Sequence, residues 1–352
     1  MRLRHWVMGG VVVALIGCAT TTRPVPKTWT ALPRATQVSP NDLARITGVT
    51  VLREKAPTSI RNVDGQLVDG AVRVTEKFDD IQSFDVHQAR GEVIFSAKRE
   101  HGYDIGLAAT DGSKTNWLPA DPADELDVVW APRGNKVSYV VRAKSGDFVR
   151  TLHIPTATAL SVEFPLATVH ALAWEPQAEK YAVAVSSATT SPHAEFLKYD
   201  GRERSVVIPP SARIDAEVDL FGPDAIVLRP RELQYNERLP VVVWLGDPHV
   251  WSDARAALFR GARVGLIVTE KSSDELYARI GETKWLDGSR MYVVGARREG
   301  AMSIVSAPSV AGGRYRVDDT VVSAAPDVIE SLAAGFIADQ LKRTDPTNGS
   351  SR

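Results

Sequence analysis

Residues 128–141 read VVWAPRGNKVSYVV, and this stretch decides the first half of the fold. A short apolar strand ends on Trp130, a polar turn follows, and a second apolar strand returns. Residues 171–185 repeat the arrangement around Trp174, and similar segments surround Phe84 and Phe221. The four aromatic residues lie 46, 44 and 47 residues apart along the chain.

A fixed period of this length, built from short β-rich strands and polar turns, is typical of β-propeller blades. We expect each unit to hold a strand that ends in the aromatic residue, a returning strand and a third strand. The aromatic residue would pack between neighbouring blades. About four blades can be counted over residues 78–232, which predicts an N-terminal β-propeller-like domain. A β-sandwich with evenly spaced strands is the alternative.

The last third of the sequence has a different pattern. The continuous apolar run 240–245 is typical of a strand buried on both faces. Further strands are expected at 264–268, 291–294 and 320–322, and helices at 252–260, 274–280 and 328–341. Strands that alternate with helices predict a small α/β domain with a mostly parallel sheet, here over residues 233–343.

The first residues of the chain indicate export. Positive charges at Arg2 and Arg4 precede an apolar run over residues 7–16. A membrane span needs about 20 residues, so this run fits the core of a signal peptide better. The run ends in a motif that resembles the lipobox of bacterial lipoproteins, formed by Leu15, Ile16, Gly17 and Cys18.

Cys18 is the only cysteine of the chain, so it is not expected to form an intrachain disulfide. We expect cleavage before Cys18 and acylation of its thiol, which would anchor the protein to a lipid bilayer. An ordinary secretory signal with a chance cysteine is the alternative. Ala19 after the cysteine resembles the default sorting signal for the outer membrane, facing the periplasm or the cell surface.

The rest of the organisation follows from composition. We expect a signal peptide at 1–17, a Thr- and Pro-rich tether at 18–40, a lead-in at 41–77 and a disordered tail at 344–352. A net charge of −1 gives no field for nucleic acid. No cofactor or metal is expected. Acidic residues gather in one stretch, but it lacks the spacing of a calcium loop and is typical of a solvated turn: Asp121, Asp124, Glu125 and Asp127.

A propeller followed by an α/β domain resembles the prolyl oligopeptidase family of serine hydrolases. Residues 240–249, PVVVWLGDPH, are similar to the family segment Pro-Val-Val-Val-x-x-His-Gly-Gly-Pro-His that leads into its hydrolase domain. Residues 285–295 are similar to the stretch before the family's nucleophile elbow. The resemblance implies a propeller, a hydrolase domain and a site for Ser, Asp and His in that chain order.

The catalytic positions depart from the family pattern. The elbow Gly-x-Ser-x-Gly-Gly corresponds to residues 295–300, where Arg297 takes the serine position and Glu299 that of a glycine, between Gly295 and Gly300. A guanidinium stays protonated and cannot attack a carbonyl. The expected oxyanion loop is degenerate as well, because it consists of Leu245, Gly246, Asp247 and Pro248. No histidine follows Gly295, so the base of a triad is missing.

These departures lead us to expect that the chain is not an enzyme. We expect a non-catalytic binding or scaffolding protein of the bacterial envelope, acting through its propeller on an envelope protein partner. One alternative is a serine hydrolase or peptidase of the prolyl oligopeptidase type with a displaced active site, to be sought around His249 with Asp247 or Asp253. A purely structural lipoprotein is another. The sequence leaves the oligomeric state open.

Overall fold

The structure is a computed structural model that describes residues 58–296, 302–307, 314–317, 320–322 and 326–344, and strand β1 (Thr21–Pro24). The lipobox with Cys18 and the elbow residues Arg297, Glu299 and Gly300 lie outside the described residues. Within the described part of the chain, no helix is both long and apolar enough to cross a membrane.

The chain divides into two compact units. The all-β unit contains the described residues from 58 to 212 and also residues 249–251. The α/β unit contains strand β1, residues 213–248 and the described residues from 252 onward. The boundary near Arg213 lies about twenty residues before the one expected from the sequence.

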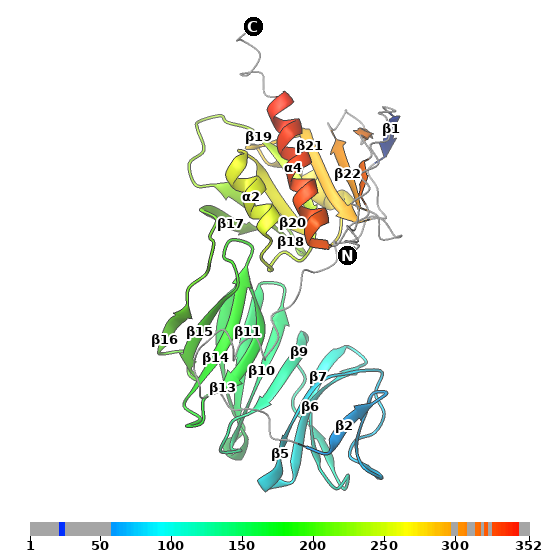
Figure 1. The fold of residues 1–352 in the computed structure, drawn as a ribbon, viewed down its shortest axis with the longest axis vertical. Coiled ribbons are helices and arrows are strands. Elements are labelled where there is room, and N and C mark those ends of the chain that lie inside the picture. The colour runs from blue at the N-terminus through cyan, green and yellow to red at the C-terminus, as the bar shows by residue number, and fades with distance from the viewer. Residues whose placement is uncertain are drawn as a thin grey trace, which may run out of the picture. The chain divides into compact units, whose positions relative to one another are not determined.

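The all-β unit consists of antiparallel sheets in which the strand order follows the sequence (Figure 1). The first sheet has three strands and each of the other three has four, in a propeller-like arrangement. Two short 3₁₀ turns, Gln88–Arg90 and Ile154–Thr156, connect strands within sheets. The strands are β2 (Ile60–Val63), β3 (Gln66–Asp69), β4 (Val72–Arg73), β5 (Ile81–His87), β6 (Glu92–Arg99), β7 (Gly102–Ala109), β8 (Thr115–Trp117), β9 (Asp124–Trp130), β10 (Lys136–Ala143), β11 (Gly146–His153), β12 (Thr158–Pro165), β13 (Ala167–Trp174), β14 (Lys180–Ser187), β15 (His193–Lys198) and β16 (Arg204–Ile208).

Two of the repeated aromatic residues lie between neighbouring sheets. Trp130 at the end of β9 is fully buried in a cluster with Ile94 and Ile105 of the preceding sheet. Trp174 at the end of β13 lies in a cluster with Val140 and Val149 of the sheet before it. A tryptophan buries a large apolar area, so one such residue per sheet joins that sheet to its neighbour. Phe84 is partly buried against the core around Phe95.

The expected blade around Phe221 is wrong. Phe221 follows β17 (Ala216–Leu220) and packs with Val241 and Leu276 of the α/β unit. Strands β17 and β18 (Ala225–Pro230) form a hairpin like that of a blade, but β18 pairs next with a strand of the α/β unit. A hairpin has the same local sequence pattern in a propeller blade and at the edge of an α/β sheet. The spacing of the aromatic residues alone therefore does not distinguish a blade from the hairpin of β17 and β18.

The α/β unit is built on a seven-stranded sheet with the order β17-β18-β20-β19-β21-β22-β24. Of its six pairings, those of β19 with β20 and with β21 are parallel, and the other four are antiparallel. The expected mostly parallel sheet is therefore a mixed sheet with a parallel centre. Its remaining elements are β19 (Leu239–Leu245), α2 (Asp253–Gly261), β20 (Gly265–Thr269), α3 (Asp274–Glu282), β21 (Leu286–Ala296), β22 (Met302–Ala307), β24 (Thr320–Val322) and α4 (Pro326–Thr344); β23 (Arg314–Val317) pairs with β1.

Strand β19 forms the centre of this unit because all seven of its residues are buried. Val241, Val243 and Leu245 share a core with residues of α3. The residues between them point to the opposite face, because side chains alternate along a strand. Helices α2 and α4 contact each other and cover the sheet on the side shown in Figure 1. The sheet is thus enclosed by helices, which requires its central strands to be apolar throughout.

Strand β21 is followed by a strand that pairs with it. Strand β22 runs antiparallel to β21, with Ala296 opposite Met302. In a nucleophile elbow the strand is followed by a helix. Residues 297–301 between the two strands lie outside the described residues.

Candidate functional site

The candidate site lies where the central strand β19 ends. In open α/β sheets, ligands bind outside the carboxyl ends of the parallel strands. Strands β19 and β20 are parallel, with Leu245 opposite Thr269 at this end. The chain then passes through residues 246–252 into α2. This connection is the segment that resembles the family's oxyanion loop.

The residues expected to form a degenerate oxyanion loop are engaged in the sheet and in α2. Leu245 is fully buried in the core. The backbone N–H of Gly246 donates to the carbonyl of Thr269 at 2.8 Å, which extends the pairing of β19 with β20. The carbonyl of Asp247 accepts from Nη1 of Arg255 at 3.2 Å. The N–H of Gly246 therefore stabilises the sheet and is not directed at a ligand.

Ser252 begins helix α2 and joins it to α4. Its Oγ accepts the N–H of Arg255 at 3.2 Å, as an N-cap does, because the first N–H groups of a helix have no partner within it. The same hydroxyl donates to Oε2 of Glu330 on α4 at 2.6 Å. Ser252 is buried and Glu330 is half-buried. A serine hydroxyl and a carboxylate thus meet at the N-terminus of a helix.

Arg255 places a positive charge beside this pair. It is 5% exposed although it lies one turn into α2, between the buried residues Ala254 and Ala256. Burial lowers the pKa of the Arg255 guanidinium, and the negative charges of Glu330 and Asp247 act in the opposite direction. A guanidinium nevertheless keeps its proton in proteins, so a cation lies under the helix N-terminus with two carboxylates near it.

This cluster, which we call the Ser252 cluster, consists of Ser252, Glu330, Arg255 and Asp247. A hydroxyl that donates to a carboxylate has a group to accept its proton, which is one requirement of a nucleophile. A guanidinium and a helix N-terminus both favour negative charge that develops nearby. The arrangement is compatible with acyl transfer at an ester or amide carbonyl. A carboxylate is a weaker base than an imidazole, so any turnover would be slow.

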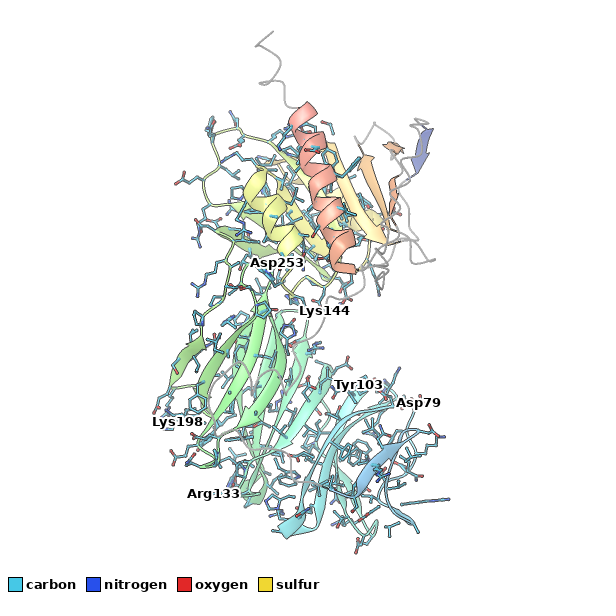
Figure 2. The ribbon with its side chains drawn as sticks, viewed as in Figure 1. Asp79, Tyr103, Arg133, Lys144, Lys198 and Asp253 are labelled. Atoms are coloured by element: carbon cyan, nitrogen blue, oxygen red, sulfur yellow. The ribbon has the colours of Figure 1, made fainter. Side chains whose placement is uncertain are left out.

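The histidine group considered from the sequence lies elsewhere. Nε2 of His249 hydrogen-bonds the carbonyl of Lys144 at 2.9 Å, and both residues belong to the all-β unit. Asp253 is exposed at the first turn of α2 (Figure 2). The described hydrogen bond of His249 thus goes to a backbone carbonyl rather than to a carboxylate. Among the described residues, no group of three His, Cys, Asp or Glu side chains could hold a metal ion.

The sequence reasoning missed the Ser252 cluster. It predicted the helix from Ser252 to Arg260, and α2 confirms that helix. It did not use the arginine that falls among the helix's buried positions. A charge on the apolar side of an amphipathic helix is a signal that a partner charge must be supplied from elsewhere. Glu330 lies on a helix 75 residues later in the chain, and no local pattern connects it to Arg255.

The chain is similar in fold to solved structures of prolyl oligopeptidase-family peptidases. The apo structure of prolyl oligopeptidase B from Galerina marginata aligns with a TM-score of 0.50 at 10% identity, covering 63% of this chain and 38% of that one. Oligopeptidase B from Leishmania major aligns at 0.49 and 11% identity, over 66% of this chain and 40% of that one. The acylaminoacyl peptidase from Pyrococcus horikoshii aligns at 0.47 and 11% identity, over 69% and 45%.

The chain spans less than half the length of each of these structures. No family model matches the sequence, and no curated protein matches it. At such low identity the likeness shows the fold alone. Our expectation of a non-catalytic binding or scaffolding protein is contradicted by this likeness, because the aligned structure of prolyl oligopeptidase B is that of a peptidase. The likeness supports the hydrolase alternative better than the scaffolding one.

Proposed function

We propose that the chain is a serine hydrolase of the prolyl oligopeptidase type whose active site is displaced to the Ser252 cluster. The observation that carries the proposal is the 2.6 Å hydrogen bond from Oγ of Ser252 to Oε2 of Glu330, beside a buried guanidinium at the end of β19. The sequence puts Arg297 where the family has its serine, so a hydrolase activity needs a nucleophile elsewhere. The fold neighbours are peptidases, which supports a peptide or a short acyl ester as substrate.

In this proposal Oγ of Ser252 attacks the substrate carbonyl and its proton passes to Glu330. The bond to the leaving amine or alcohol breaks, and the leaving group takes that proton from Glu330. Water then attacks the acyl–serine ester and gives its proton to Glu330, the acid product leaves, and Glu330 returns the proton to Oγ of Ser252. Arg255 and the N-terminus of α2 stabilise the negative charge that develops on the carbonyl oxygen.

The test is hydrolysis of a p-nitrophenyl acyl ester and of a short peptide anilide by the full chain, together with labelling by a fluorophosphonate. We expect slow turnover and labelling in the unsubstituted protein, and loss of both in Ser252→Ala. Glu330→Gln should lower kcat by at least about 100-fold, since general-base assistance contributes about 10²- to 10⁴-fold. Thermal unfolding of each variant checks that the fold is retained, because loss of an N-cap costs about 0.5–2 kcal/mol.

Ser289 provides the matched control. Its Oγ also donates to a carboxylate, Oδ1 of Asp287, at 2.5 Å, but this serine is exposed at the surface. Ser289→Ala should hydrolyse and label at the unsubstituted rate. If the unsubstituted chain neither turns over nor labels, or if Ser252→Ala retains full activity, the proposal is wrong.

We propose further that the chain is a lipoprotein, acylated on Cys18 and anchored to the outer membrane, facing the periplasm or the cell surface. The proposal is supported by the basic start, the short apolar run and the motif Leu15 to Cys18. Mass spectrometry of the purified protein should find an acylated N-terminal Cys18. Cys18→Ala should move the protein out of the membrane fraction. Recovery of an unacylated chain that begins at another residue would contradict the anchor.

A further inference from the structure

Glu125 is a fully buried carboxylate between two sheets of the all-β unit. It lies on β9, the first strand of the sheet β9–β12, and is 0% exposed. Strand β9 packs against β5, β6 and β7 of the preceding sheet. We call this contact between the sheets β5–β8 and β9–β12 the seam. The expectation of a solvated acidic turn is therefore wrong for Glu125, because its position in the strand directs it inward.

The hydrogen bonds of Glu125 cross the seam. Its Oε2 accepts the N–H of Ile105 on β7 at 3.3 Å, and its own carbonyl accepts the hydroxyl of Ser96 on β6 at 2.5 Å. Both donors belong to the preceding sheet. The carboxylate therefore lies where its charge state affects how the two sheets pack together.

The positive charge available to Glu125 is shared. Nη1 of Arg150 on β11 lies 3.5 Å from Oε1 of Glu125, whereas Nη2 of the same guanidinium is 2.8 Å from Oδ2 of Asp121. The shorter and better-formed contact goes to Asp121. A single arginine thus serves two carboxylates, and the buried one has the weaker contact.

The other charged or titratable groups around Glu125 do not supply a second cation to it. Asp104 on β7 is buried and pairs with Arg99 on β6 at 3.2 Å. The remaining groups are Asp124, which accepts the N–H of Tyr103, and Tyr139 on β10, whose pKa is raised by burial and by Glu125. Figure 2 shows Tyr103 on its strand of the preceding sheet. With Asp104, Asp121 and Glu125 all ionised, two guanidinium groups face three carboxylates.

We propose that Glu125 makes the seam sensitive to pH, so that the two sheets pack firmly while this carboxyl is neutral and loosen when it ionises. Burial raises the pKa of Glu125 to about 7, and Asp104 and Asp121 raise it as well, against the lowering effects of the Ile105 N–H and Arg150. The inference is independent of the Ser252 cluster. The export proposed above would expose the chain to the pH of the cell's surroundings, to which a group that titrates near neutrality responds.

The direction in which stability changes with pH follows from the pKa of Glu125 in the folded and in the unfolded chain. The pKa of an unperturbed glutamate is about 4.5, so the folded state holds the Glu125 proton more tightly than the unfolded state. The contribution to stability is therefore complete below about pH 4.5 and is lost as pH rises to about 7. The shift sets an upper limit of about 300-fold on the change in the folding equilibrium, and screening reduces it.

Glu195 on β15 is the matched control. It is also buried, at 5% exposure, but it accepts hydrogen bonds from Arg204 and from Nε2 of His193 at 3.2 Å. Burial raises the pKa of Glu195, but the bonds from His193 and Arg204 outweigh burial and hold it below its usual range. Its contribution has the opposite sign, because it is present at neutral pH and lost as the pH falls through the acidic range.

The experiment is urea unfolding of the full chain between pH 5 and 8.5, with Glu125→Gln and Glu195→Gln as variants. The unsubstituted chain should lose between about 10-fold and 80-fold in its folding equilibrium over this range, because the rest of the effect falls below pH 5. Glu125→Gln should remove most of that dependence, and Glu195→Gln should retain it. An unchanged pH slope in Glu125→Gln overturns the proposal.

Hydrogen exchange keeps the proposal testable should Glu125→Gln fail to fold. In the unsubstituted chain, protection of the Ile105 amide, after correction for intrinsic exchange, should fall between pH 6 and 8. Amides in the centre of β14 should keep their protection over the same range. If the Ile105 amide shows no such fall, or falls no more than those of β14, Glu125 does not control the seam.

Discussion

The two units use strands that are buried on both faces, but they order those strands differently. Within each sheet of the all-β unit, a strand pairs with the next one along the chain, as in the sheet β9-β10-β11-β12. In the α/β unit β18 pairs with β20, and β19 lies between β20 and β21. Sequential pairing needs only tight turns, whereas the crossed order needs α2 and α3 to carry the chain over the sheet. Equally buried strands can therefore result from local and from non-local pairing.

The largest expected effects test whether the two cores are equally close-packed. Trp130 lies in the seam and Trp244 near the carboxyl end of β19, and both are 0% exposed. Trp130→Ala and Trp244→Ala should each lower the free energy of unfolding by about 3–5 kcal/mol, because each leaves a large cavity. Urea unfolding of the two variants measures this. If either variant lost less than about 1 kcal/mol, its core would have repacked around the missing side chain. The two cores would then not be equally close-packed.

Two glycines in strands test the close packing of the two cores by adding volume instead of removing it. A Cβ at Gly106 on β7 would lie 2.3 Å from the ring of Phe95, and one at Gly265 on β20 would lie 2.3 Å from Cδ2 of Leu286. Gly106→Ala and Gly265→Ala should each destabilise by about 1–3 kcal/mol, since added volume forces neighbours out of their rotamers. Thermal unfolding midpoints give the result. If the unfolding midpoint stayed unchanged at one of the two sites, the sheet around that glycine would be the one that can accommodate an added methyl group.

The smallest effect concerns α4, the last helix of the α/β unit. Gly335 is exposed on α4, and a Cβ there would meet no atom within 4 Å. Gly335→Ala should stabilise the chain by roughly 0.5–1 kcal/mol, because alanine loses less conformational freedom in a helix. Differential scanning calorimetry should show a higher unfolding midpoint. Lower stability would mean that α4 does not remain helical at this position.

Much of the fold could be predicted from the sequence because its signals are local. The period of the aromatic residues predicted the propeller-like sheets. The helices expected at 252–260, 274–280 and 328–341 are confirmed as α2, α3 and α4. The blade expected around Phe221 was wrong because β17 and β18 form an ordinary hairpin. What places them in the α/β unit is the pairing of β18 with β20, which is formed about 40 residues later.

The candidate site could be predicted only in part. The resemblance around residues 240–249 located the end of β19, but it directed attention to Asp247 and His249. The structure joins Ser252, Arg255 and Glu330 there, through α2 and α4. The acidic run 121–127 was interpreted as a solvated turn, although Glu125 is fully buried. Neighbouring strand residues face opposite sides, and composition does not reveal which acidic residue faces inward.

The sequence by itself determined the repeat period, the apolar strands, the positions of the helices, and the departure from the family's catalytic motif at Arg297. Tertiary structure alone decided the crossed order of the seven-stranded sheet, the hydrogen bond between Ser252 and Glu330, and the burial of Glu125 in the seam. The physical reason is the range of the interactions. Hairpins and caps depend on residues a few positions apart, whereas sheet order and buried charge depend on elements that meet only when the chain has folded.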